Sequence, residues 1–245
     1  EYADERAVKH MCHYRWHYDE NLDAASKRFA KLFVPKAVQK IFGLRALILN
    51  KASKIFKQRM SKRLWVIGSN EVTGISIEES FKNLIRLLDK HLERRPYIFG
   101  NRPSIADFAL WGHIYNANND VTANEFIQKH TPKLNDWIDR MIDPKEQGGF
   151  EEWHQLKPTL LPLIKEEISE MFLPWVTANN DAVKNNKDEL SITLKGRPFE
   201  HKVTSVQKFH AKSFGLLMEH YKTVSQDQEL KKILVEAGAE GYLNA

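Results

Sequence analysis

The segment Pro103-Ser-Ile-Ala-Asp-Phe constrains the fold of this chain more than any other local feature. Ser104, followed three residues later by Asp107, forms a capping box, in which two side chains satisfy free amides at the start of a helix; the carboxylate also meets the positive end of the helix dipole. The helix predicted next, residues 105–115, is apolar on nearly all sides, with Phe108, Ala109, Leu110, Trp111 and Ile114. Because a helix without a polar face belongs in a core, we expect it at the centre of a helical bundle.

The rest of the sequence also favours helices. After Ser76, which forms a second possible capping box with Glu79, apolar residues recur with a 3.6-residue period: Ile77, Phe81, Leu84, Ile85, Leu88 and Leu92. Three prolines are expected to divide the helical residues 156–185 or to begin helices there: Pro158, Pro162 and Pro174. Further helices are predicted at residues 1–17, 23–32, 36–42, 44–64, 122–129, 131–142, 204–221 and 226–237.

One segment changes period. Between residues 190 and 203, Leu190, Ile192 and Leu194 alternate with polar residues, and Lys195-Gly196 offers a tight turn, which predicts a β-hairpin. The sequence therefore predicts an all-α fold with a small hairpin. We expect a helical domain over residues 1–188 and a hairpin-plus-helix extension over residues 189–245 that packs on it.

The charge of the chain is very unevenly distributed. Residues 24–70 contain no acid and twelve basic residues, so that the remainder of this chain of net charge +5 carries −7; the twelve are Lys27, Arg28, Lys31, Lys36, Lys40, Arg45, Lys51, Lys54, Lys57, Arg59, Lys62 and Arg63. Such a segment could bind nucleic acid, anionic lipid, an acidic protein or an anionic small molecule, or could simply be the solvated face of two helices. A single Cys excludes a disulfide framework.

The capping box and its flanks resemble the C-terminal domain of the glutathione S-transferase family. That family carries a Gly before the capping box and, on a later helix, a Pro followed by Trp and Arg-Met; the matching residues here are Gly100, Ser104, Asp107, Pro132, Trp137, Arg140 and Met141. The resemblance covers about residues 75–145. It implies an all-helical domain of an enzyme whose glutathione thiolate conjugates, reduces or cleaves an electrophilic small molecule.

The resemblance also implies what this chain lacks. In that family a preceding thioredoxin-like domain binds the cosubstrate glutathione and supplies the catalytic Tyr, Ser or Cys, and no part of this sequence looks like it. The first residue, Glu1, opens a helix without a capping signal, so we expect the natural chain to extend upstream. The family further implies a cleft wall built from the first and central helices, a hydrophobic or anionic electrophile, a homodimer and a cytoplasmic location.

Three histidines share one face of the first predicted helix. His10, His13 and His17, with Tyr14 beside them, suit a polar-aromatic cleft, but three ligands from one straight helix give poor tetrahedral geometry, so we expect no metal site. With the resemblance, we expect His13, Tyr14 and His17, together with Trp111, to contact the substrate; an ordinary domain or subunit interface is the alternative.

Other reactive side chains in the sequence favour structural roles. Cys12 lies on the opposite side of the first helix and is typical of a small core residue. Ser104 and Asp107 have the spacing of a cap rather than of a catalytic pair, so we expect no catalytic residue in the chain. The alternative function is a non-catalytic interaction module that uses residues 27–63 to hold an acidic partner, RNA or a membrane.

Overall fold

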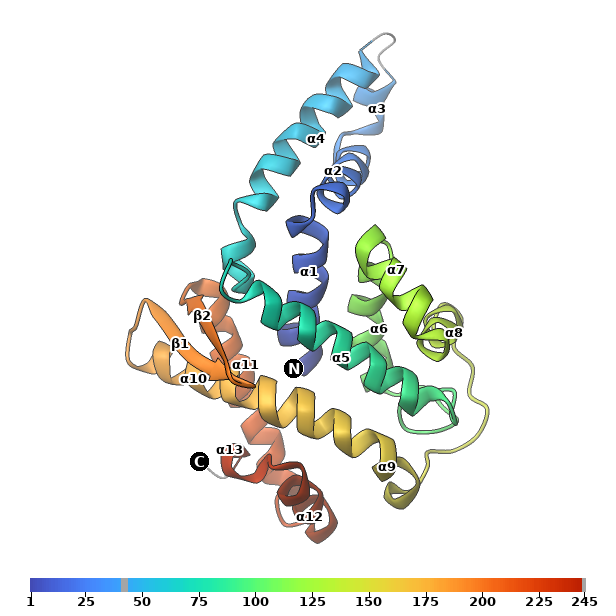
Figure 1. Ribbon diagram of the computed structural model, residues 1–245, viewed down its shortest axis with the longest axis vertical. Coiled ribbons are helices and arrows are strands. Elements are labelled where there is room, and N and C mark those ends of the chain that lie inside the picture. Colours follow the sequence, from blue (N-terminus) through green and yellow to red (C-terminus); the bar gives the residue numbers. More distant parts are fainter. Residues whose placement is uncertain (41–43, 244–245) are drawn as a thin grey trace.

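The computed structural model describes residues 1–40 and 44–243 and confirms the all-α fold with one small hairpin (Figure 1). A π-helical turn, η1 (Ala3–Ala7), leads directly into α1 (Val8–His17). The remaining elements are α2 (Asp19–Phe33), α3 (Lys36–Gln39), α4 (Arg45–Ser61), the 3-10 turn η2 (Leu64–Ile67), α5 (Gly74–Leu92), α6 (Ile105–Ala117), α7 (Val121–His130), α8 (Pro132–Arg140), α9 (Trp153–Leu163), the π-helix η3 (Ile164–Phe172), α10 (Leu173–Lys184), β1 (Glu189–Leu194), β2 (Arg197–Lys202), α11 (Ser205–Val224), α12 (Gln228–Ala237) and α13 (Glu240–Leu243).

The main core forms around α5, whose apolar face packs against α1, α8 and α9. Its residues Phe81, Leu84, Ile85 and Leu88 are almost completely buried, in agreement with their 3.6-residue period. The predicted capping box at Ser76 is wrong, because α5 already begins at Gly74 and Ser76 lies inside the helix. The side-chain oxygen of Asn70 accepts hydrogen bonds from the amides of Val72 and Thr73. These bonds close the turn before α5, so that the helix begins two residues before Ser76.

Helix α6 is not the fully buried centre that its sequence predicts. Ser104 and Asp107 form the capping box at its start, and Leu110 and Ile114 are buried against the main core. On the other side, Ile105 is 87% exposed and Phe108 is 51% exposed. The prediction was wrong because α6 packs against η1, α1 and α8 on one face, whereas no described residue covers the opposite face of Ile105 and Phe108.

The prolines do not divide the helical run from Trp153 to Lys184. Pro158 and Pro162 lie inside α9, and the backbone passes into the π-helix η3 at Ile164 and then into α10 without a break. Each proline removes one backbone hydrogen bond. Burial of Leu156, Leu160 and Leu163 in the main core offsets that loss, so packing decides where the sequence alone predicts a boundary.

The predicted hairpin is confirmed. Strands β1 and β2 pair antiparallel, with Leu194 opposite Arg197. The connecting residues Lys195 and Gly196 have φ of 47° and 78°, the left-handed pair that a type I′ turn requires and that fits the twist of the strands. Leu194 and Phe199 are fully buried in a second cluster with Trp175, so the hairpin lies on α10.

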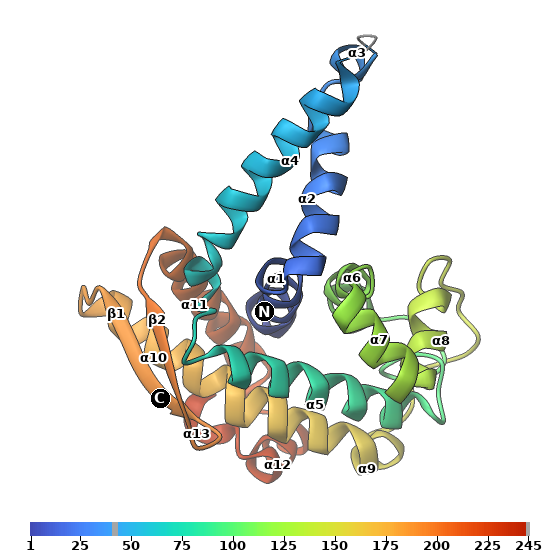
Figure 2. The same cartoon turned by 45° about the horizontal axis from the view of Figure 1, so that its top comes forward.

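Helices α2 and α4 form an antiparallel pair that projects from the rest of the molecule; both views show it extending away from the bundle (Figures 1 and 2). We call residues 19–40 and 44–63 the arm. No residue of α4 is buried, because α2 is its main neighbour. The helix predicted at residues 36–42 is present as α3, and its last two residues lie outside the described part of the chain.

Candidate functional site

The structure brings three of the four predicted site residues together between α1 and α5. His13 is fully buried; its Nδ1 is hydrogen-bonded to Ser69 Oγ at 2.8 Å, and its Nε2 lies 3.3 Å from Glu78 Oε1. Its ring stacks on the exposed His17, with ring centroids 4.6 Å apart. Tyr14 is buried beside them against Phe81.

The electrostatics of this group do not favour acid-base chemistry. Burial lowers the pKa of His13, so its ring is neutral at neutral pH. Burial also opposes ionisation of Glu78, but hydrogen bonds from Tyr18 and His13 outweigh it and hold the pKa of Glu78 below its ordinary value. Burial raises the pKa of Tyr14 and of Tyr18. The group is therefore a hydrogen-bonded joint between α1 and α5.

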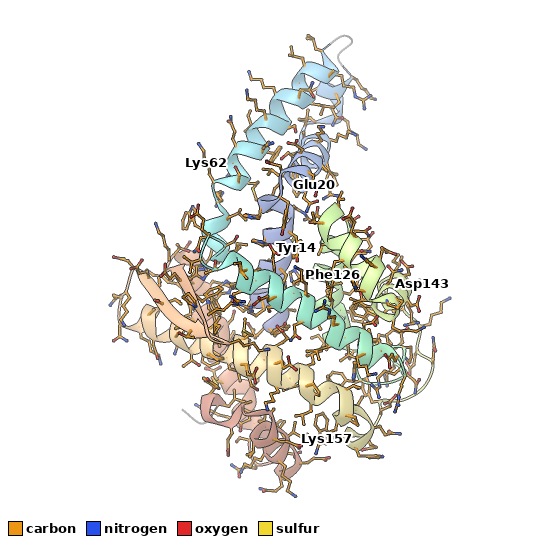
Figure 3. The ribbon with its side chains drawn as sticks, in the orientation of Figure 1. Tyr14, Glu20, Lys62, Phe126, Asp143 and Lys157 are labelled. Carbon is orange, nitrogen blue, oxygen red and sulfur yellow. The ribbon has the colours of Figure 1, made fainter. Side chains whose placement is uncertain are left out.

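Of the predicted residues, Tyr14 lines a hollow between α1, α5 and α7. The hollow, about 300 Å³, is lined by Tyr14 and Tyr18, by Phe126 of α7 and by charged residues that include Lys82 and Lys129. Figure 3 labels Tyr14 and Phe126. Trp111 lies elsewhere: its Nε1 donates to Ile138 O of α8 at 3.0 Å, and its ring stacks on Tyr115. The structure therefore does not bring Trp111 to the histidine face.

The predicted histidine face does not form a metal centre in residues 1–40 and 44–243, where no group of three His, Cys, Asp or Glu side chains is placed to hold an ion. His10 instead faces Ser80, 3.0 Å from its Oγ. Burial raises the pKa of Cys12 to about 11, so its thiol stays protonated and is a poor nucleophile.

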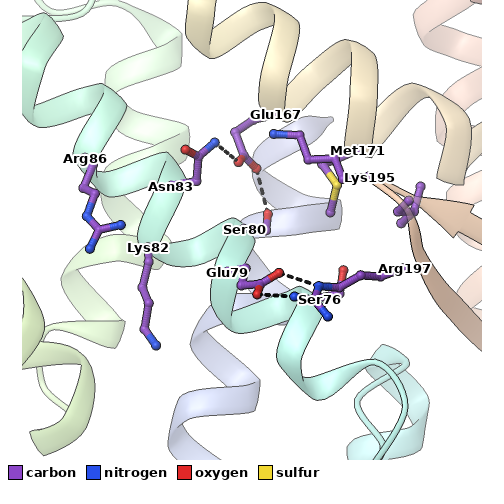
Figure 4. A pocket seen from close by; sticks show the side chains of 11 residues that line it. Ser76, Glu79, Ser80, Lys82, Asn83, Arg86, Glu167, Met171, Lys195 and Arg197 are labelled. Atoms are coloured by element: carbon purple, nitrogen blue, oxygen red, sulfur yellow. Dashed lines mark hydrogen bonds and ion pairs between the residues drawn. The ribbon is translucent and has the colours of Figure 1, made fainter.

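A second hollow, also about 300 Å³, is polar and lies between α5, η3 and the hairpin (Figure 4). Arg197 of the hairpin donates two hydrogen bonds of 2.6 Å to Glu79. At the floor, the buried Glu167 accepts from Ser80 at 2.7 Å and from Asn83 at 2.8 Å. Burial raises the pKa of Glu167, although these hydrogen bonds oppose the shift. Because Arg197 of the hairpin is paired with Glu79 of α5 across this hollow, the ion pair holds the hairpin against α5.

A third hollow, of about 470 Å³, has a different character. It lies between η1, α6, α9 and η3, and only Glu1 and Asp4 among its lining residues are charged; the others are Tyr2, Ala3, Leu88, Ile98, Phe99, Ile105, Ala106, Ala109, Leu110, Leu160, Leu163, Ile164 and Ile168. Concave, mostly apolar hollows of this size are typical of small-molecule sites. The exposed face of α6 forms one of its walls.

This hollow involves the two elements that the resemblance implies for a cleft wall, but none of the predicted site residues lines it. The first helix and the capping-box helix are the two elements expected to form a cleft wall, yet the lining residues are Tyr2 and Ala3 in the first and Ile105, Ala106 and Ala109 in the second. The signal that points to α6 is its lack of a polar face; no comparable signal distinguishes Tyr2.

The fold and the hollow define a helical bundle of the kind that binds small molecules between its helices. A comparison with known families matches residues 50–140 to the glutathione S-transferase C-terminal domain. The matched range runs from α4 to α8 and includes the capping box of α6. This match supports a glutathione S-transferase C-terminal domain within the chain, over residues 50–140.

Comparisons with curated proteins and with solved structures gave no match. Among the described residues, no helix is both long enough and apolar enough to span a bilayer.

Proposed function

We propose that the chain is the substrate-binding C-terminal domain of a glutathione S-transferase-like enzyme, which uses glutathione as cosubstrate to conjugate or reduce a small electrophile. The observation that carries this proposal is the apolar hollow between η1 and α6. It stands on the two helices from which the matched family builds its substrate cleft.

The residues of the hollow would bind the electrophile and exclude water from it. Walls such as Phe99, Ile105 and Leu163 favour an apolar body, because transfer of apolar surface out of water is favourable. Asp4 and Glu1 at the edge disfavour a ligand that is anionic at that end. In conjugation by substitution, the glutathione sulfur would form the new bond to carbon, and the displaced group would leave with the bonding electron pair. In conjugation by addition to an α,β-unsaturated ketone, the sulfur would bond to the β-carbon and the resulting enolate would take up a proton.

Glutathione itself would be held by a thioredoxin-like domain that covers the open face of α6. The exposed Ile105 and Phe108 support this part of the proposal, because contiguous exposed apolar surface marks contact sites. Burial keeps the Cys12 thiol protonated, so the thiolate would come from glutathione. By the same resemblance we propose that the protein is a homodimer and acts in the cytoplasm.

The test uses the full-length protein with immobilised glutathione and with a panel of chloronitrobenzenes and α,β-unsaturated ketones. We expect retention on glutathione and turnover of at least one electrophile class. The variant Ala109→Trp fills the hollow from an exposed position and should raise the KM for the electrophile, with the KM for glutathione unchanged. Ala24→Trp, exposed on the arm, is the matched control and should change neither.

Two results would contradict the proposal. Absence of both retention and turnover would show that the protein does not use glutathione. Turnover that Ala109→Trp leaves unchanged would show that the electrophile binds outside the apolar hollow.

A further inference from the structure

The arm carries a large unpaired positive charge. Arg28 pairs with Asp120, and Lys57 pairs with Asp19 and Asp23 at the base of the arm. The other ten basic residues of the acid-free segment are all exposed, and none has an ion-pair partner within residues 1–40 and 44–243. Charges that stabilised the folded chain would be expected to have partners, so this set is free to attract an anionic surface.

The same arm exposes large apolar side chains. Leu32 is 72% exposed and Phe33 is 65% exposed at the end of α2, and Leu47 is 65% exposed in the first turns of α4. The end of α2 and the first turns of α4, which carry these residues, point away from the bundle (Figures 1 and 2). Lys31, Arg45 and other basic residues alternate with them, so that one surface combines both chemistries.

An aromatic hollow where α2 and α4 meet α1 repeats this combination. It measures about 370 Å³ and is lined by Phe29, Phe33 and Phe56, together with Met11, Cys12, Arg15 and Trp16 of α1, and Arg59, Met60 and Arg63. The rings of Phe29 and Phe33 are stacked, with centroids 5.8 Å apart. No acidic residue lines this hollow, so it suits a molecule with an apolar chain and an anionic head.

We propose that the arm docks on an anionic lipid bilayer. Its apolar end would enter the boundary between headgroups and acyl chains, while the lysines and arginines contact lipid phosphates and carboxylates. Helices that combine exposed apolar residues with Lys and Arg are typical of such interfacial binding, and long basic side chains can lie along apolar surface while their charges stay at the headgroups. The inference does not depend on the proposed enzymatic function.

A bilayer accounts for both features of the arm, whereas nucleic acid accounts for one. Nucleic acid would neutralise the basic residues but would leave Leu32, Phe33 and Leu47 in water, because its backbone offers charge and not apolar surface. A second copy of the chain could offer its net negative remainder to the arm. Both are outcomes of the test.

The test is co-sedimentation of the full-length protein with two kinds of vesicle, one of phosphatidylcholine alone and one with about 30% phosphatidylserine. We expect the apparent affinity for the anionic vesicles to exceed that for the neutral ones at least about tenfold, and to fall when the salt rises from about 100 to about 500 mM. The double variant Lys51→Glu/Lys54→Glu should reduce binding about tenfold or more, because it reverses two exposed charges of α4.

A second variant tests the apolar contribution. Leu32→Ser/Leu47→Ser keeps every charge and should still weaken vesicle binding several-fold. The control is Lys232→Glu/Val235→Ser on α12, which makes the same kinds of change at exposed positions of the bundle and should leave binding unchanged. Because all of these positions are exposed, the variants should fold.

Three results would overturn the proposal. The first is equal binding to both kinds of vesicle, or binding that neither arm variant alters. The second is binding to duplex RNA, at the same salt, that is tighter than to anionic vesicles, lost in the charge variant and kept in the leucine variant. The third is a dimer in solution that either arm variant dissociates.

Discussion

Replacing Asp107 by Ala should destabilise the protein strongly, because this carboxylate is fully buried and accepts four hydrogen bonds. The donors are the amide of Ile98 at 2.9 Å, the amide and hydroxyl of Ser104 at 2.9 and 2.7 Å, and Trp137 Nε1 at 3.0 Å. The side chain thus joins the loop before α6, the start of α6 and the middle of α8. Removing it leaves all four donors without this acceptor.

The magnitude follows from these contacts. A buried donor left without an acceptor costs about 1–3 kcal/mol, and two of the four, at Ile98 and Trp137, are completely enclosed. Loss of the helix cap adds about 0.5–2 kcal/mol. Since neighbouring losses are not additive, we expect a decrease of about 3–6 kcal/mol in the free energy of unfolding. Asp107→Asn keeps one acceptor oxygen and should lose about half as much.

Urea unfolding followed by circular dichroism measures both variants. The matched control is Asp136→Ala, an exposed carboxylate on α8 whose loss should change stability by no more than about 0.5 kcal/mol. The reasoning would be refuted if Asp107→Ala unfolded with the free energy of the parent and yet abolished glutathione-dependent turnover of the full-length protein. That result would assign Asp107 a catalytic role instead of a structural one.

Two further substitutions test the backbone conformation at Gly100 and the effect of the buried His201 on stability. Gly100 has φ of +122°, and a Cβ there would lie 2.7 Å from the amide nitrogen of Glu151, so Gly100→Ala should lower the melting temperature by several degrees, whereas Gly149→Ala, with open space around it, should not. Burial lowers the pKa of His201 to about 3, whereas a histidine in the unfolded chain has a pKa of about 6.5. Between pH 6.5 and pH 3 the unfolded chain therefore binds a proton at this histidine that the folded chain does not, so the protein loses stability as the pH falls below about 6.5. At pH 5 this histidine alone should lower the free energy of unfolding by about 2 kcal/mol relative to pH 7.5. In urea titrations at the two pH values, His201→Gln should remove this difference, whereas the control His154→Gln, at an exposed position, should retain it.

Local signals in the sequence predicted structure well where the stabilising contacts are themselves local. The box of Ser104 and Asp107 and the turn at Lys195 and Gly196 are closed by residues within three positions of one another. The similar box predicted at Ser76 was wrong, because a competing local contact begins the helix earlier. The side chain of Asn70 accepts hydrogen bonds from the amides of Val72 and Thr73. The prolines of α9 failed for a different reason, since burial on a helix distant in sequence outweighed their local preference.

The candidate site was harder to predict because it depends on which helix covers which face. Helical spacing correctly placed His13, Tyr14 and His17 close together. It could not show that α5 would cover that face and pair His13 with Glu78, or that the hollow would open instead beside Tyr2 and α6. Those features depend on contacts between residues far apart in the sequence, such as the hydrogen bond from Tyr2 to Glu167, which are 165 residues apart.

The two exposed apolar surfaces of the molecule differ in charge, and this difference separates their partners. Asp107 is the only Asp, Glu, Lys or Arg on α6 and is buried, so α6 itself presents no exposed Lys or Arg to attract phosphates beside Ile105 and Phe108. Such a face is suited to another folded protein surface, where shape and apolar contact give the affinity. The arm exposes leucines among ten basic side chains that have no ion-pair partner in the described part of the chain, and it is suited to an anionic interface. Because the two surfaces suit different partners, substitutions that abolish bilayer binding by the arm should leave the protein contact of the α6 face intact, and the reverse should also hold.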